Sequence, residues 1–390
     1  MKYIVKPITI YLPIRKMPAA TATAPARIQR LNYIGSKYQL IGWLTDFMKE
    51  KTGFASFENK RIADLFAGTG VVSHHFRLQN AVVYSNDAEL YSSVIAHAFT
   101  RSFYTERTVC VIRDINAAIV TAAAAPAAPA APAAPAGFVT RHYSPYEGNE
   151  RMFFTVENAQ KIDMARTMLE AADSLSRDEY QFILASIIIS ADAVSNVPAV
   201  YGCFLKKFKS KATKPFVITP IHTITTTAAA CAGAGASAAF NADIIGDPAF
   251  LATTLPTAVD IAYLDPPYNE RQYSKNYFPL NIIAKTPREL EDESPLKGKT
   301  GIPVDCFMSS FCRKGKVAET AFDTLIRGLR AKWVFLSYNS ESIVSKEKMV
   351  EILSRYGTVS VIEREYKRFK SFEYNDDKAI QEYLFCLEKK

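Results

Sequence analysis

The residues with the clearest chemical potential are Asp265-Pro266-Pro267-Tyr268, which follow the apolar run Val259–Leu264. The run predicts a buried strand, and the prolines end it because neither donates a ladder hydrogen bond. The turn would lie at the carboxyl end of a strand, where open α/β sheets bind ligands. Asp265 and the Pro266 carbonyl would each accept one N–H of an exocyclic amino group, while Tyr268 stacks on the ring that carries it. An ordinary turn at the end of a strand could have the same sequence. The rest of the chain must therefore decide between a binding site and a structural turn.

A glycine turn earlier in the chain predicts a second binding site. Arg61–Phe66 has the composition of a strand, and Ala67–Gly70 and a helical pattern over Val71–Leu78 follow it. Strand, turn and helix in this order open nucleotide-binding units, where glycines let the backbone approach the ligand. Asp87 ends the next strand about twenty residues further on, where an acid takes both ribose hydroxyls. The turn lacks the pattern GxGxxG and the GK[ST] of a P-loop, which favours a ligand with adenosine but no phosphate.

Lys37 and Asp243 each have a functional and a structural interpretation. Lys37 follows a Gly-Ser turn in which Ser36 could cap the helix expected over 38–51. The helix dipole disfavours a cation there, so this lysine either serves an anionic ligand or is simply solvated. Asp243 falls where a third strand of the same sheet would end, and it either accepts an adenine amino group or caps a helix.

Basic residues alternate with aromatic residues in two segments. The first contains Phe204 and Phe208 among the lysines Lys206, Lys207, Lys209 and Lys211, and the second, 366–370, contains Lys367 and Arg368. Such segments suit phosphate contacts with nearby stacking, although a solvated basic face gives the same pattern. The net charge of +8 and the pI near 9.0 are compatible with a nucleic-acid partner but do not establish one.

Composition divides the chain and excludes some classes of protein. The six cysteines form no CxxC pair, so neither a disulfide scaffold nor a zinc site is indicated, and no metal is expected. No apolar run is long enough to span a membrane, and we expect a soluble, cytoplasmic protein. Two late strands with no helix between them, 359–365 and 381–387, must pair antiparallel. The expected divisions are a flexible lead (1–30), a catalytic domain (31–116 and 240–390), an Ala/Pro loop (117–137), a helical insertion (138–224) and an Ala-rich loop (225–239).

Four segments together resemble the adenine-specific DNA methyltransferases of the Dam-related class, and within it the modification enzymes of type II restriction systems. NYIGSKYQL resembles the segment that precedes the glycine turn in this class, and DLFAGTG resembles the segment that binds S-adenosylmethionine (SAM). SNDAE resembles the ribose-binding segment, and DPPYNERQYSKNYF resembles the catalytic segment with its adjoining loop. The resemblance implies a Rossmann-like α/β fold whose mostly parallel sheet has an antiparallel C-terminal strand, with an inserted helical region for target recognition. The lead and the Ala/Pro tract have no counterpart in this pattern.

The resemblance also implies roles for individual residues. Asp87 would bind the ribose of SAM, Asp243 its adenine and Lys37 its methionine carboxylate. The whole SAM site would comprise Tyr33, Lys37, Asp64, Phe66, Gly68, Gly70, Asp87 and Asp243. Asp265, Pro266 and Tyr268 would hold the target adenine, and Arg271 and Tyr273 would join the two basic segments in contacting DNA.

The expected reaction is methylation of the N6 amino group of an adenine that is rotated out of double-stranded DNA. An Asp-Pro-Pro-Tyr turn also fits cytosine N4 or an RNA base, whereas the leading Asp speaks against a protein glutamine. A DNA-binding component without catalytic activity is the alternative from another class of protein. The partners expected are double-stranded DNA and a cognate restriction endonuclease, with the chain itself a monomer.

Overall fold

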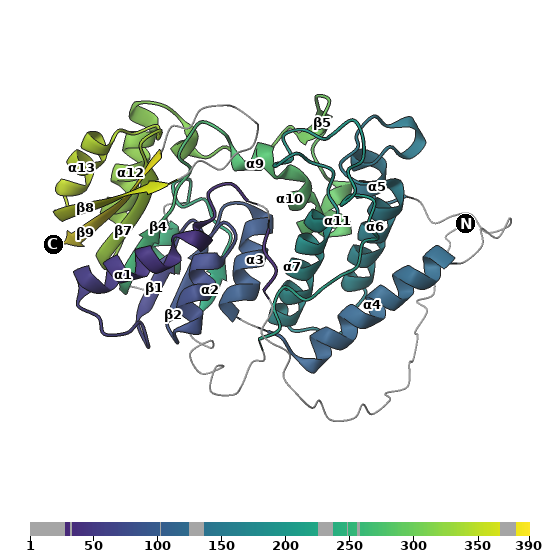
Figure 1. Ribbon diagram of the computed structural model, residues 1–390, viewed down its shortest axis with the longest axis horizontal. Helices are drawn as coiled ribbons and strands as arrows, with labels where there is room; N and C mark the ends of the chain where they lie inside the picture. Colours follow the sequence, from purple (N-terminus) through teal and green to yellow (C-terminus); the bar gives the residue numbers. More distant parts are fainter. Residues whose placement is uncertain are drawn as a thin grey trace.

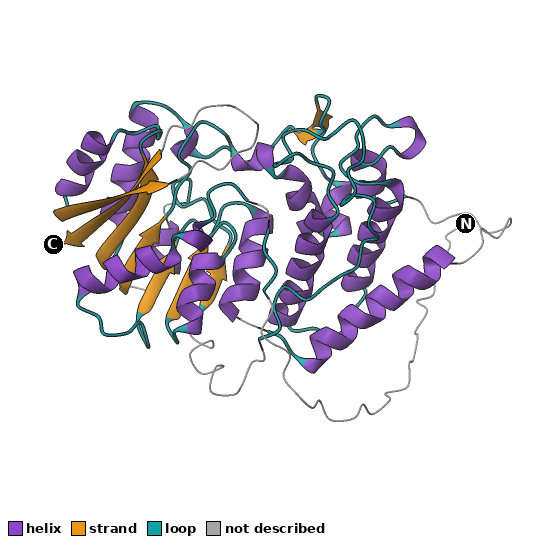
Figure 2. Cartoon of the chain, in the orientation of Figure 1, coloured by secondary structure: helices purple, strands orange, loops and turns teal. Residues whose placement is uncertain are grey.

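The protein has two lobes, one built on a sheet and one built of helices (Figure 1), and Figure 2 shows how the strands gather in the first lobe. The computed structural model describes residues 28–31, 33–101, 103–124, 136–224, 237–247, 249–255, 258–366 and 380–390. Lys367 and Arg368, which the sequence predicts to contact DNA, lie outside these residues, as do most of the lead and of the two alanine-rich tracts.

The sheet has seven strands, and five neighbouring strands are joined by parallel pairing. The strands are β1 (Arg61–Asp64), β2 (Val82–Asn86), β3 (Ala238–Phe240), β4 (Val259–Leu264), β7 (Ala331–Asn339), β8 (Gly357–Tyr366) and β9 (Ile380–Lys389). Their order is β3-β2-β1-β4-β7-β9-β8, and β9 is antiparallel to both of its neighbours. The predicted α/β class, with a mostly parallel sheet and an antiparallel C-terminal strand, is confirmed.

Helices cover both faces of this sheet, as the side chains of the central strand require. The helices are α1 (Ile41–Thr52), α2 (Val71–Leu78), α12 (Lys316–Gly328) and α13 (Lys346–Ser354). Ile261 and Tyr263 of β4 belong to the core under α1 and α2, whereas Ala262 and Leu264 belong to the core under α12 and α13. Successive residues of a strand point to opposite faces, so β4 is apolar over Ile261–Leu264, where both faces are buried. Pro266 and Pro267 then end β4 where the sequence predicts.

The second lobe has its own core of buried side chains. Its helices are α4 (Glu106–Ala124), α5 (Phe138–Tyr143), α6 (Val156–Glu170), α7 (Arg177–Ala193), α10 (Phe278–Ala284) and α11 (Pro287–Glu291). The apolar helix α7 is buried as predicted, and Ser176 and Glu179 form a capping box at its start. α3 (Leu90–Arg101) packs against α7 and so joins the two lobes.

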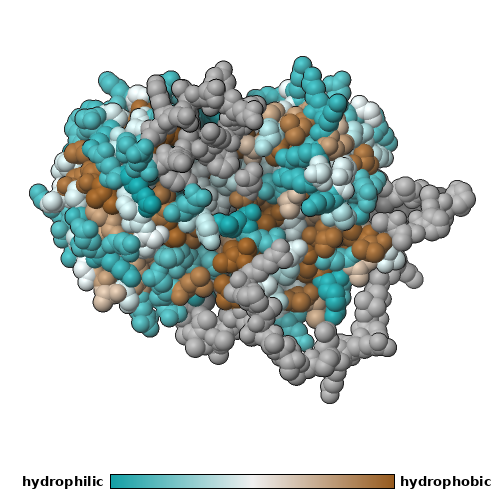
Figure 3. All heavy atoms as spheres, viewed as in Figure 1, coloured by the Kyte–Doolittle hydropathy of each residue, from teal (hydrophilic) through white to brown (hydrophobic). Residues whose placement is uncertain are grey.

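Short elements connect these helices and strands. They are η1 (Lys37–Gln39), η2 (Tyr146–Gly148), η3 (Phe250–Thr254), α9 (Tyr273–Asn276), the hairpin of β5 (Leu296–Lys297) and β6 (Ile302–Pro303), and η4 (Ser310–Cys312). Figure 3 shows that the outer face of both lobes is largely hydrophilic in this view, with scattered apolar patches.

The structure differs from the predicted divisions of the chain at three places. α4 continues to Ala124, because its alanines favour helix and its inner face packs against α6 and α7. β3 includes Ala238 and Ala239, which the sequence assigns to a loop. α10 and α11 belong to the helical lobe, although they follow the catalytic turn in sequence (Figure 1). The predicted Ser36 cap is also absent, since its side chain makes no capping hydrogen bond to η1.

Two buried histidines, His74 and His222, should make the free energy of unfolding depend on pH. Burial lowers the pKa of His74 to about 4 and that of His222 to about 3. Their rings lie 5.8 Å apart, and both contact Phe99. The unfolded chain binds protons at these residues below about pH 6.5, whereas the folded chain does not, so their contribution to the free energy of unfolding is lost as the pH falls from about 6.5 to 4.

Replacement of His74 with phenylalanine should therefore reduce the sensitivity to acid. We expect the difference in unfolding free energy between variant and wild type to move in favour of the variant by about 1.4 kcal/mol per pH unit below pH 6.5. Urea denaturation at pH 7 and pH 5 measures this difference. The comparison must be with wild type, because buried carboxylates with raised pKa values titrate in the opposite sense. A difference that is the same at both pH values would contradict the prediction.

Candidate active site

A cavity of about 1190 Å³ opens at the carboxyl edge of the parallel strands, between the two lobes. Parallel sheets place their ligands at this edge because every strand there ends in a loop that can carry a functional side chain. Twelve of the residues that the sequence singles out line the cavity: Tyr33, Lys37, Phe66, Gly68, Asp87, Lys211, Asp243, Asp265, Pro266, Tyr268, Arg271 and Tyr273. Asp64 and Gly70, also predicted for the SAM site, are not among the lining residues.

The glycine turn between β1 and α2 has a backbone conformation that other residues rarely adopt. Gly68 has a φ of +52° and Gly70 a φ of +68°. A Cβ on Gly70 would lie 2.8 Å from the Phe99 ring, and a Cβ on Gly68 would lie 3.2 Å from the Tyr33 ring. Both glycines are therefore required for the turn to pass between α3 and Tyr33, and the surface that it presents to the cavity is backbone.

Asp64 at the end of β1 is buried beneath this turn. Ser73 of α2 donates a hydrogen bond to its Oδ2 at 2.7 Å, while Oδ1 has no hydrogen-bond partner among the described residues. Burial raises the pKa of Asp64 to about 7, although Ser73 opposes the shift. Asp64 thus fixes the start of α2, and its predicted contact with the cofactor remains a prediction.

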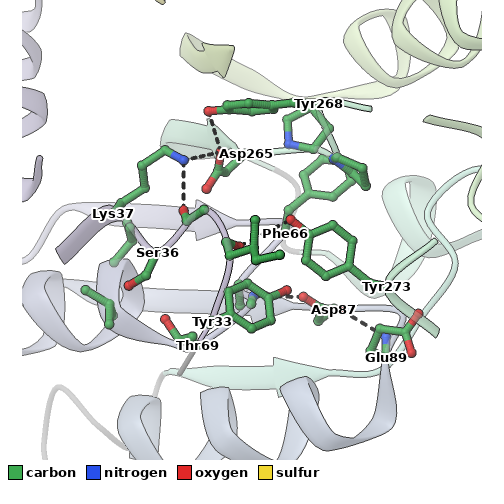
Figure 4. Close-up of a pocket in the computed structure, with 18 of the residues that line it drawn as sticks. Tyr33, Ser36, Lys37, Phe66, Thr69, Asp87, Glu89, Asp265, Tyr268 and Tyr273 are labelled. Atoms are coloured by element: carbon green, nitrogen blue, oxygen red, sulfur yellow. Dashed lines mark hydrogen bonds and ion pairs between the residues drawn. The ribbon is translucent and has the colours of Figure 1, made fainter. Parts of the chain in front are cut away.

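Two carboxylates follow β2 on the floor of the cavity (Figure 4). Asp87 Oδ2 accepts a hydrogen bond from the Gly68 amide at 2.8 Å, and Oδ1 accepts one from the Glu89 amide at 2.9 Å. Glu89 is buried, and Asn281 of α10 donates to its Oε2 at 2.7 Å. Burial raises the pKa of Asp87, and it raises that of Glu89 to about 8. No residue pattern in the sequence singles out Glu89.

Asp243 lies beside this pair because β3 pairs with β2. The Asn86 side chain bonds both the amide and the carbonyl of Ala242 at 3.1 Å, which fixes the chain just before Asp243. Asp243 Oδ1 accepts from the Ile245 amide at 3.1 Å, and the chain continues as a turn. No helix begins at Asp243 within the described residues, so the capping alternative does not apply.

The Asp-Pro-Pro-Tyr corner carries a network of charged and hydroxyl groups (Figure 4). Lys37 Nζ lies 2.9 Å from Asp265 Oδ1 and 3.6 Å from Glu382 Oε1. The Tyr268 hydroxyl lies 2.9 Å from Asp265 Oδ1 and 2.7 Å from Glu382 Oε1. Burial raises the pKa of Asp265, and Lys37 and Tyr268 oppose that shift. The contacts of Asp265 with Lys37 and with Tyr268 both involve Oδ1.

Lys37 and Tyr273 make contacts that the sequence does not predict. The Lys37 ammonium faces Asp265, Glu382 and the Gly35 carbonyl, which it contacts at 3.0 Å, so its predicted pairing with a methionine carboxylate has no support here. Tyr273, predicted to contact DNA, packs at 5.3 Å from the Tyr33 ring and 6.0 Å from the Tyr277 ring. It therefore belongs to the tyrosine cluster on the side of the glycine turn.

The four predicted lysines of the first basic segment fall into two pairs. Lys206 and Lys207 are exposed and form no hydrogen bond or ion pair with any described residue. Lys209 donates to the Val197 carbonyl, and Lys211 donates to the Asp192 carbonyl at 3.4 Å. The first pair is thus available to a phosphate backbone, while the second pair helps to hold its own loop.

Replacement of both Lys206 and Lys207 with alanine should weaken binding to duplex DNA. Loss of two phosphate contacts would reduce the slope of log affinity against log salt concentration by about 1.8. Fluorescence anisotropy from about 50 to 200 mM salt measures the slope. The matched control replaces Lys332 and Lys348, two lysines of the sheet lobe. A slope equal to that of wild type would remove the first pair from the interface.

A sheet of this order, with a glycine turn, an acid after β2 and an Asp-Pro-Pro-Tyr corner around one cavity, defines a Rossmann-like methyltransferase. The chain belongs to the family of D12 class N6 adenine-specific DNA methyltransferases, which matches residues 33–352. The predicted family is therefore confirmed, and the protein is a site-specific adenine methyltransferase that acts on DNA.

Type II methyltransferases are similar to the chain over most of its length. M.CviAII of Paramecium bursaria Chlorella virus 1 is 39% identical over 361 residues, which cover 92% of this chain and 99% of that protein. M.NlaIII of Neisseria lactamica is 35% identical, with the same two shares covered. M.FokI of Planomicrobium okeanokoites is 29% identical, and the match covers 53% of it. No solved structure matches the chain. Among the described residues, no helix has the length and apolarity needed to cross a membrane.

Proposed function

We propose that the cavity binds SAM and an everted adenine side by side, and that the methyl group passes to N6 of that adenine. The observation that carries this proposal is the convergence of the β1 turn, the acid after β2 and the β4 corner on one cavity. These features come from three neighbouring strands, so a ligand on the glycine turn and a base on the corner would lie next to each other.

The residues on the floor of the cavity fit SAM. The space that a Cβ on Gly68 would fill is left open beside Tyr33, and the turn offers backbone to a ligand. Asp87 would accept the ribose hydroxyls, and Asp243 an amino group of the cofactor's adenine. Phe66 adds an apolar contact in the cavity wall. SAM supplies a methyl group on a sulfonium, which is a good leaving group.

The corner would hold the target base by its amino group. Lys37 and the Tyr268 hydroxyl both bond Asp265 Oδ1, which leaves Oδ2 to accept one N–H. The Pro266 carbonyl would accept the other N–H, and the Tyr268 ring would stack on the base. Two acceptors on the amino protons direct the nitrogen lone pair out of the ring plane, and positioning then supplies most of the rate.

The helical lobe is the proposed reader of the DNA sequence. α7 contributes Asp192 and Ala193 to the cavity wall, so this lobe lies against the place proposed for the everted base. Lys206, Lys207 and Arg271 would contact the phosphate backbone. The proposal extends to a monomeric, cytoplasmic enzyme. It also includes a companion endonuclease for the same DNA site, because the relatives are named as type II methyltransferases.

Sequencing of DNA from cells that express the chain tests the proposal. Hosts without adenine methylation should acquire N6-methyladenine at one short sequence, and the purified protein should label duplex DNA that contains it from methyl-labelled SAM. Cytosine substrates and RNA of the same sequence serve as controls for the alternative bases. Label that appears in these controls and not in duplex adenine would contradict the proposal.

A further inference from the structure

The sequence assigns no role to Glu382, which the fold places at the catalytic corner. Glu382 comes from β9, and its register with Asn339 brings it to the carboxyl end of β7, beside the turn that follows β4. Its side chain is 5% exposed, and it lines the cavity. A buried carboxylate in this position has to be explained by a partner or by a function.

One hydroxyl group joins Glu382 to Asp265. The Tyr268 oxygen lies 2.7 Å from Glu382 Oε1 and 2.9 Å from Asp265 Oδ1. A tyrosine hydroxyl carries one proton, so it donates to one carboxylate and accepts from the other only if that carboxylate is protonated. The arrangement is thus complete when the two carboxylates share one additional proton.

The charges around Glu382 favour such sharing. Burial raises the pKa of Glu382, Lys37 lowers it, and the charge of Asp265 raises it again. Lys37 is already a cation, so it balances one carboxylate and cannot take a proton itself. The other titratable groups near this network come from β1, β4 and β7 and from the segments that follow β4 and β7. They are Asp64 of β1, Tyr263 of β4, which bonds Ser337 at 2.8 Å, Tyr273 after the corner, Tyr338 of β7, whose ring lies 5.1 Å from that of Tyr268, and Glu341, which follows β7 and lines the same cavity.

Methylation of an amino group must release a proton in a place that water reaches poorly. The amino nitrogen forms a bond to the methyl carbon as the carbon–sulfur bond breaks, and the nitrogen then carries two protons, the methyl group and a positive charge. One of these protons must leave to give neutral N6-methyladenine. With DNA bound over the cavity, the first acceptor in reach is Asp265.

We propose that Glu382 is the final acceptor of this proton, which it receives from Asp265 through the Tyr268 hydroxyl. The inference rests on the proposed function. Asp265 takes the proton from N6 on Oδ2, and rotation of the carboxyl group about the Cβ–Cγ bond then presents this proton to the Tyr268 oxygen. As Asp265 passes the proton on, the hydroxyl proton of Tyr268 moves to Glu382 Oε1. Tyr268 ends unchanged, Asp265 is again a carboxylate, and Glu382 is a neutral acid that releases its proton to water when the product leaves. Glu382 is a positioning residue in this scheme, since it acts through Tyr268.

Glu382→Gln separates this role from a structural one. Glutamine keeps an oxygen that accepts a hydrogen bond from Tyr268, but it cannot take up the proton. The assay is single-turnover methyl transfer to the mapped duplex site from about pH 5 to pH 9, with dissociation constants for SAM and DNA measured in parallel. Glu388→Gln is the matched control, because Glu388 lies on the same strand with its side chain 49% exposed.

We expect Glu382→Gln to transfer the methyl group about 10- to 100-fold more slowly, with both dissociation constants unchanged. The acid limb of its pH–rate profile should also move to lower pH. The pKa of Asp265 should fall because Asp265 no longer shares Lys37 with a second carboxylate. A wild-type rate, or a slower rate with an unmoved acid limb, would overturn the inference. If Glu382→Gln fails to bind SAM, the single-turnover rate of Tyr268→Phe tests the relay instead. A rate about 10-fold below that of wild type supports the relay, and a wild-type rate overturns it.

A wild-type chain that methylates no adenine would instead contradict the proposed function.

Discussion

Replacement of Asp265 with alanine is expected to reduce methyl transfer at least about 1000-fold while SAM binding stays within a few-fold of wild type. Asp265 follows β4, whereas the glycine turn and Asp87, the groups proposed to hold SAM, follow β1 and β2, so its carboxylate is not expected to be needed for SAM binding. The variant removes the acceptor that orients the amino nitrogen. In this variant Lys37 keeps Glu382 as a partner at 3.6 Å, so the loss of stability from removing one partner of a buried cation is limited.

Single-turnover transfer and calorimetric titration with SAM measure the two quantities. Asp260→Ala is the matched control. Asp260 lies at the start of β4, at the end opposite to the Asp-Pro-Pro-Tyr corner, and it accepts a hydrogen bond from the Arg61 amide at 2.7 Å. Asp265→Asn should fall between alanine and wild type, since it keeps an acceptor and loses the charge. Full activity of Asp265→Ala would remove the assigned role.

Replacement of Asp87 with alanine is expected to have the opposite effect. The affinity for SAM should fall about 100-fold or more, because two hydrogen bonds to a carboxylate are worth about 1.5–3 kcal/mol each. Loss of the bond to the Gly68 amide would also release the turn that lines the site. At saturating SAM, the rate of methyl transfer should stay near that of wild type.

Isothermal titration of Asp87→Ala with SAM gives the affinity, and single-turnover assays over a range of SAM concentrations give the rate at saturation. Asp265→Ala serves as the reciprocal control, since it should lose the rate and keep the affinity. Unchanged affinity in Asp87→Ala would show that the acid after β2 shapes the turn without binding the ligand.

Local patterns in the sequence predicted much of the frame. The apolar run of β4 and its two prolines set both ends of the strand, because each signal lies within a few residues of the structure that it determines. The same holds for the glycine turn and for the antiparallel pairing of β8 with β9. The boundaries of α4 and β3 were missed, because alanine-rich sequence has no hydrophobic period to reveal which part packs.

Partners that are distant in sequence could not be predicted. Glu382 reaches Tyr268 across 114 residues, and only the closure of the sheet brings them together. One signal was present: Glu382 is in phase with Ile380 and Leu384 along β9, so it had to face a buried layer. The position of Tyr273 depends likewise on the stacking of three tyrosines from two segments, which spacing along the chain does not contain.

The most direct test of the central claim is a crystal structure of the chain with duplex DNA and S-adenosylhomocysteine. The account predicts an adenine outside the helix, with its ring on Tyr268 and its amino nitrogen within about 3.2 Å of Asp265 Oδ2 and of the Pro266 carbonyl. The adenosine of the cofactor product should lie on the turn between Gly68 and Asp87. A target adenine that remains stacked in the duplex, or an amino group that faces away from Asp265, would contradict the account.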